Sequence, residues 1–265
     1  MDGGQQLSDS DSPAAETVER RIAGIAVADL TGDAAIRRLE AELSAGGAPT
    51  RLAFLNAHCV NLVRRNASYR QALQECLVLP DGIGVDLAAQ LLYGARFREN
   101  LNGTDFVPRL LAALERPCRV ALIGGAPGVA ERAGARFREI APRHDYTAVS
   151  DGYFDAAAQP GILAALERAR ADIVLVAMGV PAQEIFIARA LDFRHGRLFV
   201  GVGALFDFCA GNVSRAPKMI RRLRMEWVWR LALEPARLWR RYILGNPAFL
   251  LGILRDRFLP HHPVG

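Results

Sequence analysis

The sequence has few cysteines, and nothing in their spacing suggests that they work together. Its 265 residues include four of them, Cys59, Cys76, Cys118 and Cys209. These spacings match neither a zinc site nor a disulfide framework. The five histidines are not spaced with carboxylates or thiols as metal ligands would be. We therefore expect reduced thiols in a reducing compartment, no metal ion and no other cofactor.

Long uncharged segments are also missing. The longest near the C-terminus runs from Tyr242 to Leu254, 13 residues including Pro247, whereas a membrane-spanning helix needs about 20. The first basic residue is Arg20, and the acidic segment before it lacks the charged and apolar parts of a secretion signal. We expect no spanning helix, no secretion, and a disordered acidic tail over residues 1–19.

The sequence does have enough apolar residues for a large core, at 51% hydrophobic and 23% charged. Short apolar runs alternate with segments of helical period, a pattern typical of parallel βαβ units. The strands expected are Arg51–Leu55, Leu77–Leu79, Arg119–Ile123, Tyr146–Val149, Ile173–Ala177 and Leu198–Val202. The helices expected are Ala57–Glu75, Val85–Leu92, Thr104–Glu115, Val129–Ile140, Ala156–Ala169 and Ala182–Phe193. Residues 20–213 are thus predicted to form a Rossmann-like α/β domain with a doubly wound, mostly parallel sheet.

Ligands of such sheets lie beyond the carboxyl ends of the strands, where this sequence is rich in Gly and polar residues. The glycines from Gly124 to Gly128 lie between a strand and a helix and could cradle a diphosphate or simply form a tight turn. Asp81 could be a general base in a cleft or a turn residue of Asp-Gly. Thr104 or Asp105 could bind substrate or cap the next helix.

The last fifth of the chain is strongly basic. From Arg215 to Arg257 it has eleven Lys or Arg against three Asp or Glu, a net charge of +8, and it holds all three tryptophans. Indole rings beside Arg suit a membrane interface or a nucleic-acid strand. We expect residues 214–258 to form a helical appendage of two or three short helices, with Pro235 and Pro247 each starting one. Residues 259–265 are expected to be a disordered tail.

Arginine side chains could take the place of a metal ion in neutralising the charge of a diphosphate. The only Asp-x-Asp spacing, Asp9 to Asp11, lies in the acidic tail, whereas a metal-dependent sugar-nucleotide enzyme usually has it after a strand. Planar guanidinium groups bind phosphate oxygens in pairs. On one continuous helix Arg230, Arg237 and Arg240 would lie within about 80° of one another, unless Pro235 interrupts it.

Several ordered blocks together resemble the WecG/TagA/CpsF family of bacterial glycosyltransferases, over about Arg21 to Leu250. The blocks are the Asn56 turn, Leu79-Pro80-Asp81-Gly82, Asn102-Gly103-Thr104-Asp105, Ile123-Gly124-Gly125, Asp151-Gly152-Tyr153-Phe154, Ala177 to Glu184, Gly201 to Asp207, Arg215-Ala216-Pro217, and Glu226-Trp227 followed by Arg230, Glu234-Pro235 and Arg237. The resemblance implies an inverting, metal-independent transfer of a hexose-type sugar from a UDP-sugar to a polyprenyl-diphosphate-linked saccharide, in surface polysaccharide biosynthesis.

The resemblance also implies roles for residues. Asp81 would be the general base, Gln183 a partner of the substrate, and Arg230 and Arg237, from an appendage that closes over the site, catalytic cations. Substrate-binding positions carried over from the blocks are Asn56, Gly82, Asn102, Thr104, Asp105, Gly124, Gly125, Tyr153, Gly179, Gln183, Glu184, Gly203, Asp207 and Arg240. The enzyme would work at the inner face of the cytoplasmic membrane as a peripheral protein, without a nucleic-acid partner.

One position departs from the family. Some relatives carry Arg just before the Gly-Thr-Asp block, where this chain has Asn100, so donor or acceptor contacts differ there. Two other functions stay open at this point: a nucleotide-dependent oxidoreductase, although the dinucleotide fingerprint is absent, and a non-enzymatic membrane or nucleic-acid-binding module. Self-association is open too, since no residue identifies an interface.

Overall fold

A parallel sheet of six strands organises the protein. The computed structural model describes residues 18–217, 219–220 and 225–259. The strand order is β4-β3-β8-β7-β5-β6, and every neighbouring pair is parallel. The strands are β3 (Thr50–Leu55), β4 (Leu77–Pro80), β5 (Arg119–Gly124), β6 (Asp145–Ser150), β7 (Ile173–Ala177) and β8 (Leu198–Gly201). The predicted fold class is confirmed.

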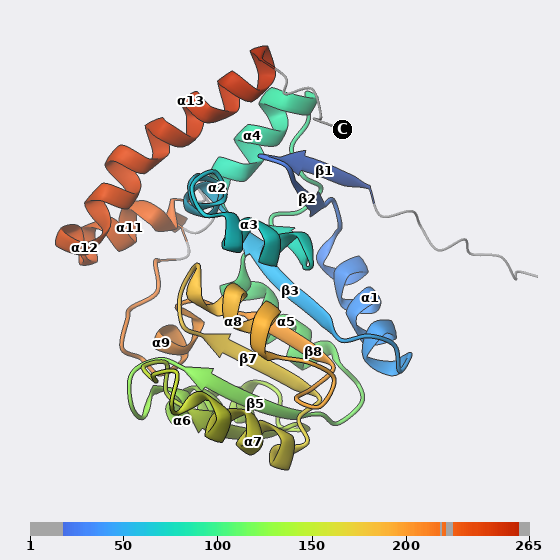
Figure 1. Cartoon of the computed structure of the whole chain (residues 1–265). Coiled ribbons are helices and arrows are strands. Elements are labelled where there is room, and N and C mark those ends of the chain that lie inside the picture. Colours follow the sequence, from blue (N-terminus) through green and yellow to red (C-terminus); the bar gives the residue numbers. More distant parts are fainter. Residues whose placement is uncertain (1–17, 218, 221–224, 260–265) are drawn as a thin grey trace, which may run out of the picture.

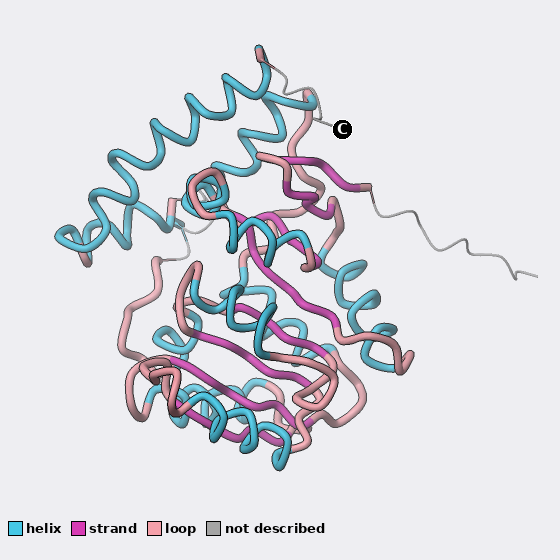
Figure 2. The backbone as a smooth tube through the Cα atoms, viewed as in Figure 1, coloured by secondary structure: helices cyan, strands magenta, loops and turns pink. Residues whose placement is uncertain are grey.

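Helices cover both faces of this sheet (Figures 1 and 2). One face carries α1 (Gly32–Ser44), α5 (Gly103–Ala113), α6 (Val129–Ile140) and α9 (Leu205–Cys209). The other carries α2 (Ala57–Val63), α3 (Ala67–Gln74), α7 (Gln159–Ala169) and α8 (Ala182–Ala190). Successive residues of a strand point to opposite faces, so Phe54 packs against the first set and Leu55 against the second.

Two sequence expectations fail near the N-terminal half. The helix expected over Ala57–Glu75 is two helices, because Asn66 adopts an extended backbone and caps α3 by accepting from the N–H of Tyr69 at 2.9 Å. The hairpin of β1 (Glu19–Ile22) and β2 (Ile25–Ala28), together with α1, was not predicted. Residues 1–17 of the expected tail lie outside the described residues, and Glu19 already belongs to the hairpin.

The C-terminal helices run differently from the prediction. After α11 (Glu226–Leu233), three elements follow without a break: α12 (Pro235–Trp239), the π-helical turn η1 (Arg240–Leu244) and α13 (Gly245–Phe258). Pro235 starts α12 as expected, and Pro247 lies in the first turn of α13, which begins two residues earlier at Gly245. A proline is tolerated there because the preceding π turn already interrupts the regular hydrogen-bond ladder. Residues 260–265 of the expected second tail lie outside the described part.

The long C-terminal helix packs on two helices of the main domain. Phe249 and Ile253 of α13 are buried against α2 and α4 (Ile83–Tyr93). The side chain of Asn61 donates to the carbonyl of Gly245 at 2.7 Å, and Arg64 pairs with Asp256. Figure 1 shows α13 lying along α4, outside the layers of the sheet. Among the described helices, none has the length and apolar content to cross a bilayer.

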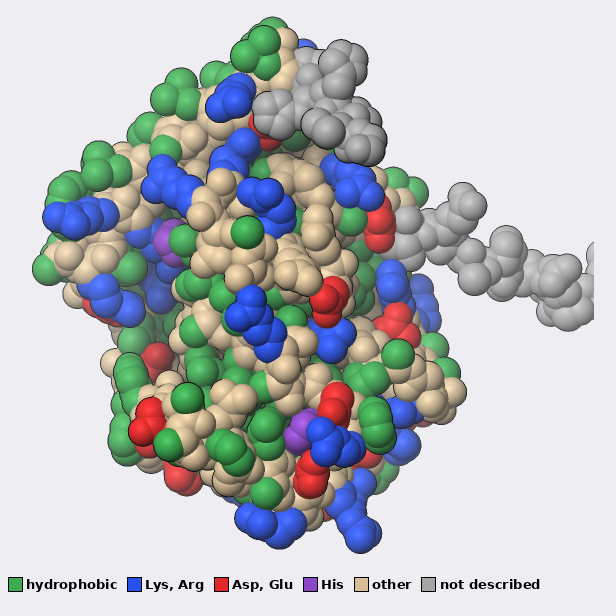
Figure 3. Space-filling view, in the orientation of Figure 1, with side chains coloured by type: hydrophobic (Ala, Val, Ile, Leu, Met, Phe, Trp, Pro, Cys, Tyr) green, Lys and Arg blue, Asp and Glu red, His purple; other side chains and the backbone are tan. Residues whose placement is uncertain are grey.

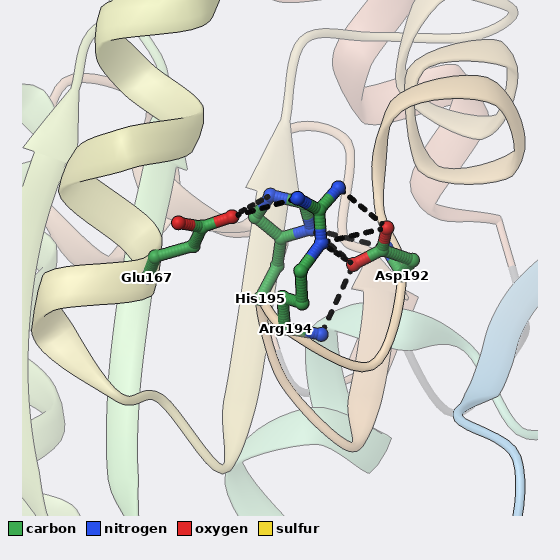
Figure 4. A network of polar contacts seen from close by, with 4 residues as sticks. All are labelled: Glu167, Asp192, Arg194 and His195. Carbon is green, nitrogen blue, oxygen red and sulfur yellow. Dashed lines mark hydrogen bonds and ion pairs between the residues drawn. The ribbon is translucent and has the colours of Figure 1, made fainter.

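A polar network closes the amino-terminal end of the sheet (Figure 4). His195 is almost fully buried, and its Nδ1 lies 3.0 Å from a carboxylate oxygen of Asp192. Arg194 bridges Asp192 and Glu167, at 2.9 and 3.3 Å, and so ties α7 to the loop before β8. These residues hold two segments together at the end of the sheet opposite the strand ends predicted to carry the site.

Candidate active site

The carboxyl ends of β3 and β4 bring Asn56 and Asp81 together. Both follow a buried strand directly, and the backbone N–H of Asp81 continues the ladder by donating to the carbonyl of Leu55 at 2.9 Å. Asn56 caps α2 by accepting from the N–H of Cys59, and its Nδ2 donates to Asp81 Oδ2 at 3.2 Å. The cap fixes the Asn56 side chain, which in turn orients the carboxylate.

Opposing influences act on the ionisation of Asp81. Burial raises its pKa above the ordinary value, and the carboxylate of Asp105 adds to this rise. The hydrogen bond from Asn56, then the guanidinium groups of Arg241 and Arg230, act in the other direction. The carboxyl is therefore a stronger base than an exposed aspartate while two cations favour its charged form, a combination suited to general-base chemistry.

A side-chain clamp holds the loop that carries Asp81. Asn100 accepts from the N–H of Gly82 at 2.8 Å and donates to the carbonyl of the same residue at 3.0 Å. Gly82 has φ +83°, a conformation that an L-residue adopts at a cost. The residue that departs from the family pattern is thus engaged with the backbone next to Asp81.

Asn102, rather than Thr104 or Asp105, caps the following helix. Its Oδ1 accepts from the N–H of Asp105 and its Nδ2 donates to the Asp105 carboxylate, both at 3.0 Å. The capping role expected of Thr104 or Asp105 is therefore wrong, because Asn102 has the extended backbone of an N-cap. Asp105 also pairs with Arg215 from the segment after α9.

Comparison with known proteins decides the family. The family model described as "Glycosyl transferase WecG/TagA/CpsF family" matches residues 20–263. The chain belongs to this family of glycosyltransferases. Among its relatives is the N-acetylglucosaminyldiphosphoundecaprenol N-acetyl-beta-D-mannosaminyltransferase of Bacillus spizizenii, 33% identical over 193 residues, which are 72% of this chain and 73% of the relative. The protein of the same name from Bacillus subtilis (strain 168) is 35% identical over 182 residues, 68% of each chain.

Family membership confirms the resemblance found in the sequence. The chain is a glycosyltransferase, so the alternatives of an oxidoreductase and of a non-enzymatic module are no longer supported. The family assignment does not test the roles of single residues, and these stay predictions.

Gln183, predicted to contact substrate, lies in the protein interior. It is 2% exposed, its Oε1 accepts from the N–H of Gly203 at 3.0 Å, and its Nε2 donates to Glu184 at 2.8 Å. Glu184 is 1% exposed, and burial raises its pKa to about 7. In this arrangement Gln183 holds the turn after β8 in place from below the strand ends.

The glycines after β5 have a packing role. A Cβ on Gly124 would lie 2.3 Å from the carbonyl oxygen of Ala177, so no side chain fits. The N–H of Gly125 donates to that same carbonyl at 2.9 Å and is not available to a phosphate. Of the two interpretations left open, the tight turn is the one that these contacts support.

Other predicted binding residues lie around the same edge. Tyr153 is 81% exposed on the loop after β6. Gly179 and Gly203 have φ values of +75° and +55° in the turns after β7 and β8. Asp207, half-buried on α9, accepts from Asn212 at 3.4 Å. Thr104 is half-buried in the first turn of α5.

The appendage brings only some of its arginines to Asp81. Arg230 is half-buried, lies over the ring of Phe208 at 5.7 Å and acts on Asp81. Arg237 is exposed and pairs with Glu234, and Arg240 is exposed over the ring of Trp239. The continuous helix that would align all three is absent, because Glu234 leaves helical geometry and Pro235 starts a new helix.

Sequence reasoning missed Arg241 and His58. Arg241, on η1, acts on Asp81 and on His58 of α2, and its Nε is buried without a hydrogen-bond partner. Burial, with Arg241, lowers the pKa of His58 to about 4. No sequence signal separates Arg241 from Arg240, although Arg240 is exposed and Arg241 is half-buried. Among the described residues, no group of three or more His, Cys, Asp or Glu is arranged to hold a metal ion.

Proposed function

We propose that this glycosyltransferase moves a hexose-type sugar from a UDP-sugar to a saccharide linked to polyprenyl diphosphate, with inversion at the anomeric carbon. The observation that carries the proposal is the Asp81 carboxylate, oriented by Asn56 at the strand ends and faced by arginines of the appendage. The names of the relatives, which describe an N-acetylmannosaminyl transfer to a diphosphoundecaprenol-linked sugar, support the acceptor class.

The proposed reaction is a single displacement. Asp81 takes the proton of the acceptor hydroxyl while that oxygen forms a bond to the anomeric carbon. The bond from this carbon to the diphosphate of UDP breaks, and UDP leaves from the opposite face with the bonding electron pair. Arg230, with its buried and unpartnered Nε, is suited to stabilise the charge that develops on the leaving diphosphate, so no metal ion is required for that task.

Release of UDP in the presence of EDTA tests the proposal. A panel of UDP-sugars is incubated with a soluble polyprenyl-diphosphate-sugar analogue and the full chain. We expect acceptor-dependent release from one donor, lowered at least about 100-fold in Asp81→Asn, since general-base catalysis contributes about that much or more. Asp145→Asn, an exposed aspartate at the start of β6, serves as the matched control. Near-normal release by Asp81→Asn would make Asp81 a turn residue, and dependence on manganese would contradict the metal-free mechanism.

We also propose that α13 lies on the inner surface of the cytoplasmic membrane, where a polyprenyl-linked acceptor would be found. Figure 3 shows hydrophobic side chains along the outer edge over α13, with Lys and Arg side chains beside them. The exposed apolar residues recur at helical spacing on the face opposite Phe249; they are Pro247, Leu250, Leu251, Leu254 and Phe258. Exposed Arg255 and Arg257 flank this stripe, an arrangement suited to anionic lipid headgroups.

Sedimentation with phosphatidylglycerol vesicles tests the membrane contact. We expect the double variant Leu251→Asp, Leu254→Asp to lose vesicle binding. Phe193→Asp, which changes an exposed phenylalanine before β8, should bind as the unchanged chain does. Equal binding of both variants would exclude α13 as the contact. Light scattering on the same samples would measure the self-association that stays open.

A further inference from the structure

Arg241 is placed by an unusual piece of helix. It is the second residue of η1, a π-helical turn between α12 and α13. A π turn has more residues than an α turn and rotates all later side chains around the axis, and such turns are frequent at functional sites. At the start of this turn Arg240 is exposed, whereas Arg241 is half-buried.

The guanidinium group of Arg241 lacks an anion of its own. Its Nε is buried without a hydrogen-bond partner, and within residues 18–217, 219–220 and 225–259 no carboxylate forms an ion pair with it. It contacts the ring of Tyr242 at 5.5 Å and acts on Asp81 from beyond ion-pair distance. An unpaired cation at this depth is costly unless an anionic ligand completes it.

The two arginines that act on Asp81 approach from different faces of the sheet. Arg230 lies over Phe208 of α9, a helix on the face that also carries α1, α5 and α6. Arg241 acts on His58 of α2, and α2 packs on the other face. In an inverting displacement the acceptor and the leaving group lie on opposite faces of the anomeric carbon. The two diphosphates of such a reaction therefore need two separate cationic groups.

An apolar surface follows Arg241 directly along the same helix. Ile243 and Leu244 of η1 are 53% and 57% exposed, and the outer stripe of α13 continues from them. A ligand in which a diphosphate is joined to a long hydrocarbon suits this arrangement. The cation can bind the diphosphate, and the apolar surface next to it can contact the hydrocarbon. Arg230 is followed by a single large exposed apolar residue of its own helix, Leu233, before α11 ends and α12 begins.

We propose that Arg241 binds the diphosphate of the polyprenyl acceptor and that the exposed apolar residues from Ile243 onward receive the start of its hydrocarbon chain. This proposal rests on the proposed function. Arg230 is left to the diphosphate of the donor. His58 stays uncharged beside Arg241 at neutral pH and can accept or donate a hydrogen bond there without competing for the anion.

Binding of farnesyl diphosphate to the full chain, with no donor present, tests the proposal. The readouts are calorimetric affinities for farnesyl diphosphate, UDP and inorganic pyrophosphate. We expect Arg241→Ala to weaken farnesyl diphosphate binding about tenfold or more, as expected for a charge-assisted contact, and to change UDP binding less than about twofold. The affinity of Arg241→Lys for farnesyl diphosphate should lie between those of the unchanged chain and Arg241→Ala. Lysine keeps the positive charge but lacks the planar guanidinium group that binds two phosphate oxygens at once. Arg230→Ala should give the opposite pattern, and Arg65→Ala, an exposed arginine after α2, should change neither affinity.

Several outcomes would overturn the assignment. These are no binding of farnesyl diphosphate to the unchanged chain, equal losses for farnesyl diphosphate and UDP in Arg241→Ala, or pyrophosphate binding as tightly as farnesyl diphosphate, which would exclude the apolar part. Failure of the proposed function looks different. A chain that binds farnesyl diphosphate through Arg241 but transfers no sugar would contradict the reaction and not the binding site. Normal transfer with an unchanged acceptor KM in Arg241→Ala would contradict the binding site alone.

Discussion

The carboxyl edge of the sheet and the C-terminal helices contribute opposite charges and are held by different contacts. At the edge, Asn56 and Gln183 make hydrogen bonds to neighbouring loops, and Gln183 and Glu184 are buried. In the appendage, α11 and η1 have no buried residue at all. Among the described helices of the appendage, α12 and α13 bury side chains, those of Leu238, Phe249 and Ile253. Asp81 thus lies in a part of the chain that is held by hydrogen bonds. Arg230 and Arg241 lie on α11 and η1, and these elements have no buried residue to hold them.

Each region has a buried phenylalanine whose replacement should destabilise that region. We expect these two substitutions to have the largest effects on stability. Phe206 is fully buried in the core between the sheet and α6, and Phe249 is 1% exposed under α13. Phe206→Ala should lower the free energy of unfolding by about 3–5 kcal/mol, as large cavities do. Phe249→Ala should release α13 and abolish transfer while the sheet unfolds near its normal urea concentration.

The tryptophans make this comparison measurable. All three, Trp227, Trp229 and Trp239, belong to the appendage, so tryptophan fluorescence follows the appendage and far-UV circular dichroism follows the whole chain. Phe206→Ala should shift both urea transitions together, and Phe249→Ala should move the fluorescence transition alone. If both variants shift both signals equally, the two regions unfold as one unit and the contrast drawn above is wrong.

Two glycines at the carboxyl edge of the sheet should differ in how much their replacement by alanine lowers stability. Gly124→Ala places a Cβ 2.3 Å from a backbone oxygen, whereas the same change at Gly82 meets nothing within 4 Å. Both residues have positive φ, which costs alanine about 1–3 kcal/mol. Gly82→Ala should lose about that much in urea unfolding, and Gly124→Ala should lose at least about 3 kcal/mol, as backbone clashes do. Equal losses would mean that the β5 turn moves aside freely.

The sequence predicts the edge better than the appendage for a physical reason. Parallel strands end at one edge, so apolar runs followed by Asn56 and Asp81 predict which loops meet. Orientation within the loops is not encoded so simply, which is why Gln183, expected at the substrate, lies buried beneath Gly203. On the appendage the phase of every side chain depends on the break at Glu234 and the turn η1, and composition specifies neither.

The buried carboxyl of Glu184 makes the folding stability depend on pH. Burial raises its pKa from 4.5 to about 7 in the folded chain, so the folded state holds a proton that the unfolded state releases. Stability from this group is therefore complete below pH 4.5 and is lost as pH rises through 7, by about 3 kcal/mol at most. Glu184→Gln should raise the melting temperature at pH 8 and leave it unchanged near pH 4.

A matched substitution checks that the effect belongs to burial. Glu131→Gln removes an exposed carboxylate from the first turn of α6 and should not raise the melting temperature at pH 8, because a negative charge there favours the helix N-terminus. A gain from Glu184→Gln that is equal at pH 4 and pH 8 would show that burial does not raise the pKa of this carboxyl.

The ion pair that joins the appendage to α2 should have the smallest effect on stability. Arg64 and Asp256 join α2 to α13 with Nη1 and Oδ1 3.1 Å apart, and their side chains are 28% and 23% exposed. A double-mutant cycle with Arg64→Ala and Asp256→Ala, followed by tryptophan fluorescence in urea, should give a coupling of about 1 kcal/mol. The coupling should shrink at high salt, because a partly exposed pair is screened. The cycle on Arg136 and Glu139, a more exposed pair within α6, should give about 0.3 kcal/mol. A coupling no larger for Arg64 and Asp256 would leave Phe249 and Ile253 as the contacts that hold α13, and with it Arg241, against the domain.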